Sequence, residues 1–362
     1  MNGDPVRETI NPQMVILARQ SRGMTQTSLA TSLGWNQGVV SKVENGLEPL
    51  SDERLKALAG ILDYPVHFFA RQSAVDGPGL TEVYHRKLAR ASATTLHKMH
   101  AEAVIRRYEI RELLKSFDEL PEEPFPNFPI DAFEGNPAKI ARTVRAVLQV
   151  PPGPIFSMTK VIESAGGIVI SCSFDTRDVD GFSRWREDTP PIFYLNSAQP
   201  TDRWRWTLAH EFGHVVMHTT SGPYDNMETD ANLFAEEFLA PKSEIKFQLG
   251  PNLTLSRLAA LKQYWKISMQ ALINRAFHLG VLTENARRYL FMQLSKAGYL
   301  RHEPDEIAPP PEPPELLPNI IKYHREKLGY SDEDLCRVLA LNKSDLYRWY
   351  KPDGRHLRAV TQ

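Results

Sequence analysis

Cysteine is nearly missing from this chain, which has Cys172 and Cys336 in 362 residues. The two lie far apart and neither has a second cysteine nearby, which argues against a disulfide framework and against a cysteine-based zinc site. Long apolar runs that could span a bilayer are missing too. The first ten residues lack the basic start and apolar stretch of a signal peptide. We therefore expect a cytoplasmic protein with no membrane partner.

A strong charge of one sign is also missing. The formal net charge is −1, so composition alone does not indicate a nucleic-acid-binding protein. Hydrophobic residues make up 42% and charged residues 24% of the chain, which is ordinary for a globular protein. Because 362 residues exceed what one ordinary core holds, the sequence predicts two or three domains.

Proline-rich breaks and helical spacing divide the chain into four parts. We expect a small all-α domain, a helical connector that ends in a proline-rich linker, a central domain and a small helical C-terminal segment, at residues 8–72, 81–135, 136–300 and 316–355. The apolar runs GGIVIS and PPIFYLN in the central part predict buried strands. The fold class is therefore mainly α with a small sheet, an α+β arrangement.

The sequence HEFGH at residues 210–214 is the main candidate for a catalytic site. On a helix, His210 and His214 lie one turn apart on the same face, so that both imidazoles can reach one metal ion. Glu211 lies beside that face, as a general base must. Since catalytic zinc usually has three protein ligands and a position for water, a third ligand is required.

Acidic residues on the next predicted helix supply that ligand. Glu228 is the first choice, because Asn232 follows one turn later and could support a ligand by a hydrogen bond. Asp230, with its shorter side chain, is the second choice. The pair Glu236 and Glu237 comes last, because it lies near the apolar end of the helix.

The segment that carries these residues resembles the core of the ImmA/IrrE family of metallopeptidases. Residues 181–241 read GFSRWREDTPPIFYLN, then DRWRWTLAHEFGHVVMH, then ETDANLFAEEFLAP. The family typically has a strand ending in Asn, an Asp-Arg pair, A-H-E-x-G-H and E-x-E-A-N-x-F-A; Asp230 stands where the second Glu is usual. The resemblance extends over about residues 136–300. It implies a zincin-like fold, Zn²⁺ as cofactor and cleavage of a protein partner, a repressor or an antitoxin.

This chemistry assigns roles to further residues. Zinc would polarise a water molecule and the scissile carbonyl, while Glu211 takes the proton of the water and passes it to the leaving amine. The strand PPIFYLN is expected to be the sheet edge that pairs with an extended substrate. Tyr194 and His218 are open choices for a group that stabilises the oxyanion.

Residues 13–46 show a second motif. The features T-Q-x-x-L-A, a glycine at position 34 and V-S-K-x-E-x-G resemble the Cro/C1-type helix-turn-helix family. The resemblance implies binding to double-stranded DNA. It also implies that Gln26 approaches the DNA backbone, whereas the residues that face the major groove are Gln37, Ser41 and Lys42. Homodimerisation stays open.

The charge of residues 1–70 argues against strong binding to DNA by this segment alone. Residues 1–70 contain six Lys or Arg and seven Asp or Glu, so phosphate neutralisation by this part alone is weak. The basic helix predicted at 81–117 could compensate, although such runs are usually solvated faces. A purely protein-binding use of the same fold is the alternative.

The C-terminal segment 319–351 also has helix-turn-helix spacing, with Ser331 as the expected cap. Its acidic residues favour packing or docking over DNA reading. Together these motifs predict a DNA-binding transcriptional regulator that is also a zinc endopeptidase. The rival is a non-catalytic DNA-binding repressor whose zinc site is structural or senses a ligand. The presence of Glu211 favours the enzyme, because a structural site needs no base.

Overall fold

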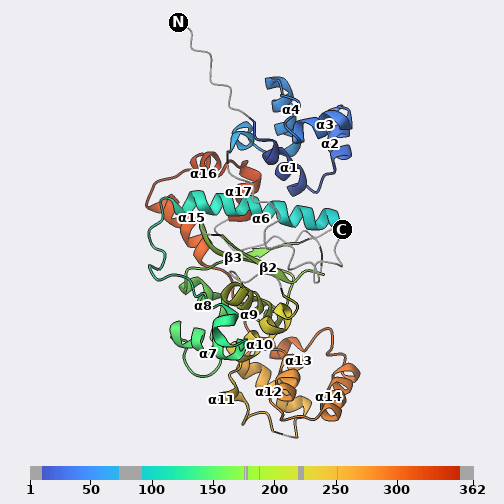
Figure 1. The fold of residues 1–362 in the computed structure, drawn as a ribbon, viewed down its shortest axis with the longest axis vertical. Helices are drawn as coiled ribbons and strands as arrows, with labels where there is room; N and C mark the ends of the chain where they lie inside the picture. The colour runs from blue at the N-terminus through green and yellow to red at the C-terminus, as the bar shows by residue number, and fades with distance from the viewer. Residues whose placement is uncertain are drawn as a thin grey trace. The chain divides into compact units, whose positions relative to one another are not determined.

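A computed structural model describes residues 10–72, 92–174, 176, 178–186, 188–218, 224–250 and 252–350 (Figure 1). The chain forms two compact units. Unit 1 contains residues up to 119, residues 174–178 and residues from 317 on. Unit 2 contains residues 120–173 and 179–316. The parts of the predictions that concern residues 8–9, 81–91 and 351–355 lie outside the described residues.

Unit 1 begins with a bundle of short helices that local sequence signals define well. These are α1 (Pro12–Ser21), α2 (Gln26–Leu33), α3 (Gln37–Glu44), α4 (Asp52–Leu62) and the 3₁₀ helix η1 (Val66–Ala70). The side chain of Thr25 accepts a hydrogen bond from the Ser28 amide, so α2 starts where the sequence predicts. Gly34 ends α2 with a φ of 66°, a left-handed conformation that glycine adopts without strain.

The long helix α6 (Ala93–Leu114) begins after its cap, Ser92. Its basic face was expected to meet DNA or solvent, but Arg106 and Arg107 are only 3% and 4% exposed. The Arg106 guanidinium lies 2.5 Å from the Glu109 carboxylate and stacks over the ring of Trp349. The expectation that these two arginines face DNA or solvent is therefore wrong, because other parts of unit 1 pack over them.

The C-terminal helices α15 (Leu316–Glu326), α16 (Asp332–Leu339) and α17 (Lys343–Tyr350) complete unit 1. Ser331 caps α16 as expected and forms a reciprocal capping box with Asp334. The Asp345 carboxylate on α17 lies 2.5 Å from the Arg22 guanidinium, which belongs to the N-terminal bundle. The segment from α15 to α17 thus packs against the bundle and α6 as part of one unit.

Unit 2 is built on a three-stranded sheet of the order β1-β3-β2 (Figure 1). The strands are β1 (Ile168–Cys172), β2 (Gly181–Arg186) and β3 (Thr189–Asn196). β3 pairs with β1 in parallel and with β2 in antiparallel orientation. The two predicted strands are therefore present, but the expectation that PPIFYLN forms a sheet edge is wrong, because it lies in the central strand. The edge strands of the described sheet are β1 and β2.

Helices cover this sheet and bring the metal motif against it. α8 (Met158–Ser164) packs on β1, and α9 (Thr201–His218) packs on β2 and β3. α10 (Met227–Leu239) packs against α9, and α7 (Pro137–Val147) packs against α10. A Cβ on Gly213 would lie 2.9 Å from the Phe234 ring, so this glycine allows the close approach of α9 and α10.

The rest of unit 2 is helical and completes its core. It contains the helices α11 (Lys242–Ile245), α12 (Leu255–Trp265), α13 (Met269–His278) and α14 (Glu284–Lys296), with the 3₁₀ helices η2 (Ile130–Phe133) and η3 (Asp305–Ile307). Leu208 and Phe212 of α9 are fully buried in this core. Among the described residues, no helix has the length and apolar character needed to cross a bilayer.

Candidate metal centre

Helix α9 carries two imidazole rings, those of His210 and His214, whose Nε2 atoms face each other. The Nε2 atoms of His210 and His214 lie 3.0 Å apart, as the one-turn spacing requires. Both side chains are buried, with exposed fractions of 1% and 2%. Because α9 is packed between the sheet and α10, both rings are held in this orientation.

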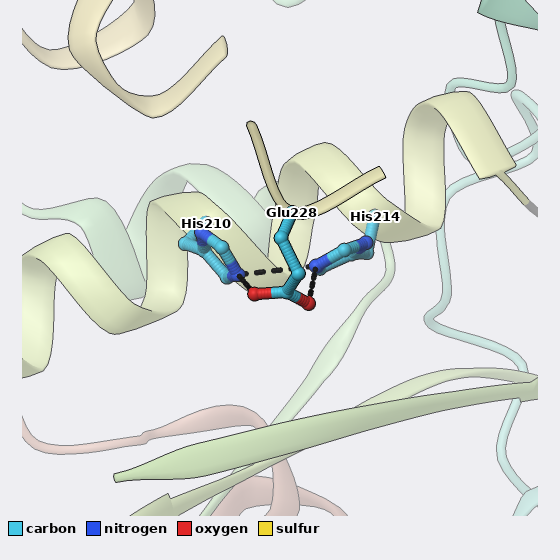
Figure 2. Close-up of side chains that lie close together, drawn as sticks. All are labelled: His210, His214 and Glu228. Atoms are coloured by element: carbon cyan, nitrogen blue, oxygen red, sulfur yellow. Dashed lines mark hydrogen bonds and ion pairs between the residues drawn. The ribbon is translucent and has the colours of Figure 1, made fainter. Parts of the chain in front are cut away.

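Helix α10 places Glu228 opposite these rings (Figure 2). The Glu228 carboxylate lies 3.2 Å from His214 Nε2 and 3.6 Å from His210 Nε2. The ligand atoms of the three residues lie within 4.8 Å of one another. Two imidazole nitrogens and one carboxylate are a donor set typical of catalytic zinc. In size and chemistry the cluster therefore fits a metal ion.

The orientation of His210 supports this fit. Its Nδ1 lies 2.9 Å from the side-chain oxygen of Asn232, which can only accept a hydrogen bond. The proton of a neutral His210 is therefore on Nδ1, and Nε2 presents a lone pair toward Glu228. A lone pair and a carboxylate that face each other are suited to hold a cation between them. Asn232, which the sequence predicts to support a metal ligand, lies against His210 rather than Glu228.

Glu211 follows His210 on α9 and is 1% exposed. The hydroxyl of Ser183, on strand β2, donates a hydrogen bond of 3.0 Å to its carboxylate. Ser183 was not a candidate from the sequence, because the segment GFSRWR lacks the alternation that identifies a half-buried strand. Gly181, on the same strand, permits close packing, since a Cβ there would lie 2.9 Å from the side chain of Thr207 on α9.

The other acidic candidates for the third ligand have different partners. Asp230 accepts a hydrogen bond of 2.7 Å from the Tyr224 hydroxyl. Glu236 lies 2.8 Å from His278 Nδ1, and Glu237 forms an ion pair with Arg275. Within the described residues, the group that could hold a metal consists of His210, His214 and Glu228. It does not include Asp230, Glu236 or Glu237.

His218 lies behind His214 rather than at an open surface. Its Nδ1 lies 2.9 Å from His214 Nδ1, and its Nε2 lies 2.9 Å from the Tyr224 hydroxyl. Burial, reinforced by the neighbouring His214, lowers the pKa of His218 to about 3. Burial and the hydrogen bond to Asp230 raise the pKa of Tyr224 above its ordinary value, so the phenol keeps its proton. Tyr224 was not a candidate from the sequence.

The four residues predicted to meet DNA lie in one region of unit 1. Gln37 and Lys42 on α3 are exposed, and Ser41 is half-buried. Gln37 donates a hydrogen bond of 2.8 Å to the side chain of Gln26 at the start of α2. Helix α3 thus presents its polar side chains outward, next to the start of α2.

Comparisons with known families identify both parts of the chain. Residues 162–277 match the model of the IrrE N-terminal-like domain, peptidase family M78, and residues 15–69 match the helix-turn-helix family. A comparison with curated proteins finds no match. Both resemblances drawn from the sequence are therefore confirmed. The chain therefore contains a segment similar to the helix-turn-helix family and a segment similar to the metallopeptidase-type IrrE N-terminal-like domain.

Proposed function

We propose that this protein is a transcriptional regulator that binds a double-stranded DNA site and hydrolyses a partner protein with a zinc-dependent endopeptidase centre. The partner is a repressor or an antitoxin, and the protein acts in the cytoplasm. The observation that carries the proposal is the buried carboxylate of Glu211, which immediately follows a metal-binding histidine. A site with a structural or sensing metal has no use for such a base.

The ligand set of the proposed centre is His210, His214 and Glu228; with three protein ligands, a zinc ion would keep a fourth position for water or substrate. Zinc bound there would act as a Lewis acid on a carbonyl oxygen and on a water molecule. The Glu211 carboxylate would take the proton of the attacking water and deliver it to the amine nitrogen that leaves. Ser183 holds one carboxylate oxygen of Glu211, which restricts the rotation of the base.

Strand β2 is the part of the sheet that we expect to meet the substrate. It is an edge strand of the sheet that the described residues form, and its Ser183 contacts the catalytic base. An extended peptide that pairs with an edge strand is held by main-chain hydrogen bonds. This assigns to β2 the role that the sequence predicted for β3.

The DNA-binding half of the proposal rests on the exposed face of α3. Gln37, Ser41 and Lys42 are the side chains that we expect to reach base edges in the major groove. We expect Gln26, at the first turn of α2, to contact a phosphate, and its side chain accepts a hydrogen bond from Gln37.

The test is the variant Glu211→Gln. Glutamine keeps the shape of the side chain and can still bond Ser183, but it cannot accept the proton of the water. We expect the variant to retain metal and fold, and to cleave the partner about 10²-fold more slowly or worse. The substrates are candidate repressors encoded beside the gene, and fragments are detected by mass spectrometry.

Two controls make the result decisive. Metal content is measured in wild type and in the variant, and a chelator must abolish cleavage by the wild type. If wild type and Glu211→Gln regulate the DNA site equally in cells and no partner is cut, the catalytic proposal is wrong. The repressor with a structural or sensing zinc site would then replace it.

A further inference from the structure

We propose that three side chains behind His214 hold its imidazole in the tautomer that can bind a metal through Nε2. The three are Asp230, Tyr224 and His218, here called the relay. The inference rests on the metal centre of the proposed function and adds positioning residues to it. The relay residues act through His214, and we assign them no contact with substrate.

The relay is a continuous row of hydrogen bonds. The Tyr224 hydroxyl lies 2.7 Å from an Asp230 oxygen and 2.9 Å from His218 Nε2. His218 Nδ1 lies 2.9 Å from His214 Nδ1. His218 is 2% exposed, so water cannot readily replace these partners on its ring. The row ends at the imidazole whose Nε2 faces Glu228.

The number of protons on each side chain determines which atom donates in each hydrogen bond of the relay. A carboxylate only accepts, so Tyr224 donates its single proton to Asp230. The Tyr224 oxygen must then accept from His218 Nε2. A neutral His218 has one N–H, so its Nδ1 has only a lone pair to offer His214. The proton between the two rings therefore sits on His214 Nδ1.

The consequence is a lone pair on His214 Nε2, which is the form that a metal requires. His210 reaches the same form more simply, because the side-chain oxygen of Asn232 accepts from its Nδ1. One side chain, the amide of Asn232, thus supports His210, whereas a row of three side chains supports His214.

Asp230 sets the direction because it has no proton to give. An asparagine in its place offers both a donor and an acceptor. If the amide donates to Tyr224, every bond in the row reverses and His214 carries its proton on Nε2, where it blocks the metal. Replacing Tyr224 by phenylalanine removes the link altogether.

The experiment measures zinc affinity of the full-length protein by competition with a chromophoric chelator. Tyr224→Phe and Asp230→Asn should each weaken the affinity by about 10–100-fold, the usual effect of partners behind a metal ligand. Asp225→Asn is the matched control, because it removes the same charge from an exposed side chain in the same segment. The control should bind zinc like wild type.

A second measurement reads the tautomer without metal. Long-range ¹H–¹⁵N NMR of the metal-free protein should find the proton of His214 on Nδ1 in wild type and a mixture of tautomers in Asp230→Asn. The proposal is overturned if His214 Nδ1 carries no proton in wild type, or if both relay variants bind zinc as tightly as Asp225→Asn. Wild type that binds no zinc would refute the metal centre itself, and the NMR result would still decide the relay.

Discussion

Helices α3 and α9 both carry polar side chains for the proposed chemistry, but they hold them in opposite ways. On α3, Gln37 and Lys42 are exposed to solvent. On α9, His210, Glu211 and His214 are 1–2% exposed. An exposed polar group can exchange water for a partner at little cost, whereas a buried one must have its partners built in. This contrast explains why the two histidines in unit 2 have buried or half-buried partners behind them, whereas the hydrogen bond from Gln37 to Gln26 is exposed to solvent.

The two helices should also respond differently to substitution. A residue on α3 should contribute its own interaction with DNA and little else, since its neighbours remain solvated. A residue at the metal centre should affect every group that it faces, because His210 and His214 are buried and both face Glu228. Substitutions in both units can test this difference, from the largest expected effect to the smallest.

The metal ligands should give the largest effect. His210→Ala, His214→Ala and Glu228→Ala should each lose most of the bound zinc, because a site with three ligands rarely survives with two. The loss should exceed the 10–100-fold expected for the relay variants. Metal content by mass spectrometry checks this. If Glu228→Ala keeps its zinc while Asp230→Ala does not, the third ligand is wrongly assigned.

A buried ion pair in unit 1 should give the next largest effect, on stability. Arg19 Nε lies 2.5 Å from Glu44, whose side chain is 3% exposed. Arg19→Ala leaves this carboxylate buried without a cation, with the hydrogen bond from Gln26 remaining, and should lower the free energy of unfolding by about 3 kcal/mol. Denaturation of the full chain by urea measures this.

The exposed pair Arg54 and Glu48 provides the control for that measurement. Arg54→Ala should change stability by less than about 1 kcal/mol, because surface ion pairs contribute little. Equal effects of Arg19→Ala and Arg54→Ala would contradict the role given to burial.

Substitutions on α3 should affect DNA binding alone. Gln37→Ala and Lys42→Ala should each weaken specific binding by about 1–3 kcal/mol for every base that the side chain no longer reaches, with zinc content unchanged. Gel-shift titration at fixed salt measures the affinity. A wild type without sequence preference would refute the regulator half of the proposal, and zinc loss in either variant would contradict the independence of the two helices.

The final expected effect is a pH dependence of unit 1. Burial raises the pKa of Glu109 from 4.5 to about 7, against the opposing influence of Arg106 and Tyr350. Between these values the folded state holds a proton that the unfolded state releases, so stability should fall as the pH rises from about 4.5 to about 7. Glu109→Gln should flatten this dependence in thermal unfolding curves. An unchanged slope would contradict the assignment to Glu109.

Some of these features could be predicted from the sequence because they depend on neighbours along the chain. Thr25 and Ser331 cap their helices by bonds to amides within the next turn. His210 and His214 share a face because a step of four residues is slightly more than one helical turn. The apolar runs GGIVIS and PPIFYLN form β1 and β3, because short apolar runs of this kind are typical of buried strands.

Other features could not be predicted because they depend on parts of the chain that meet only after folding. Strand β2 lacks a clear alternation and exists because β3 pairs with it. The basic pattern of α6 indicated a solvated face, yet Arg106 is buried against Trp349, far along the chain. In such cases the partner, and not the local pattern, decides the environment.

The sequence by itself determined where α2 and α16 begin, the spacing of the two histidines and the small number of carboxylates that could join them. Only the tertiary structure decided that Glu228 faces both imidazoles while Asp230 turns to Tyr224. The physical reason is that the crossing of α9 and α10 selects one carboxylate, and that crossing depends on the contact between Gly213 and Phe234. Residue spacing defines a face of one helix, but a site made from two helices requires their packing.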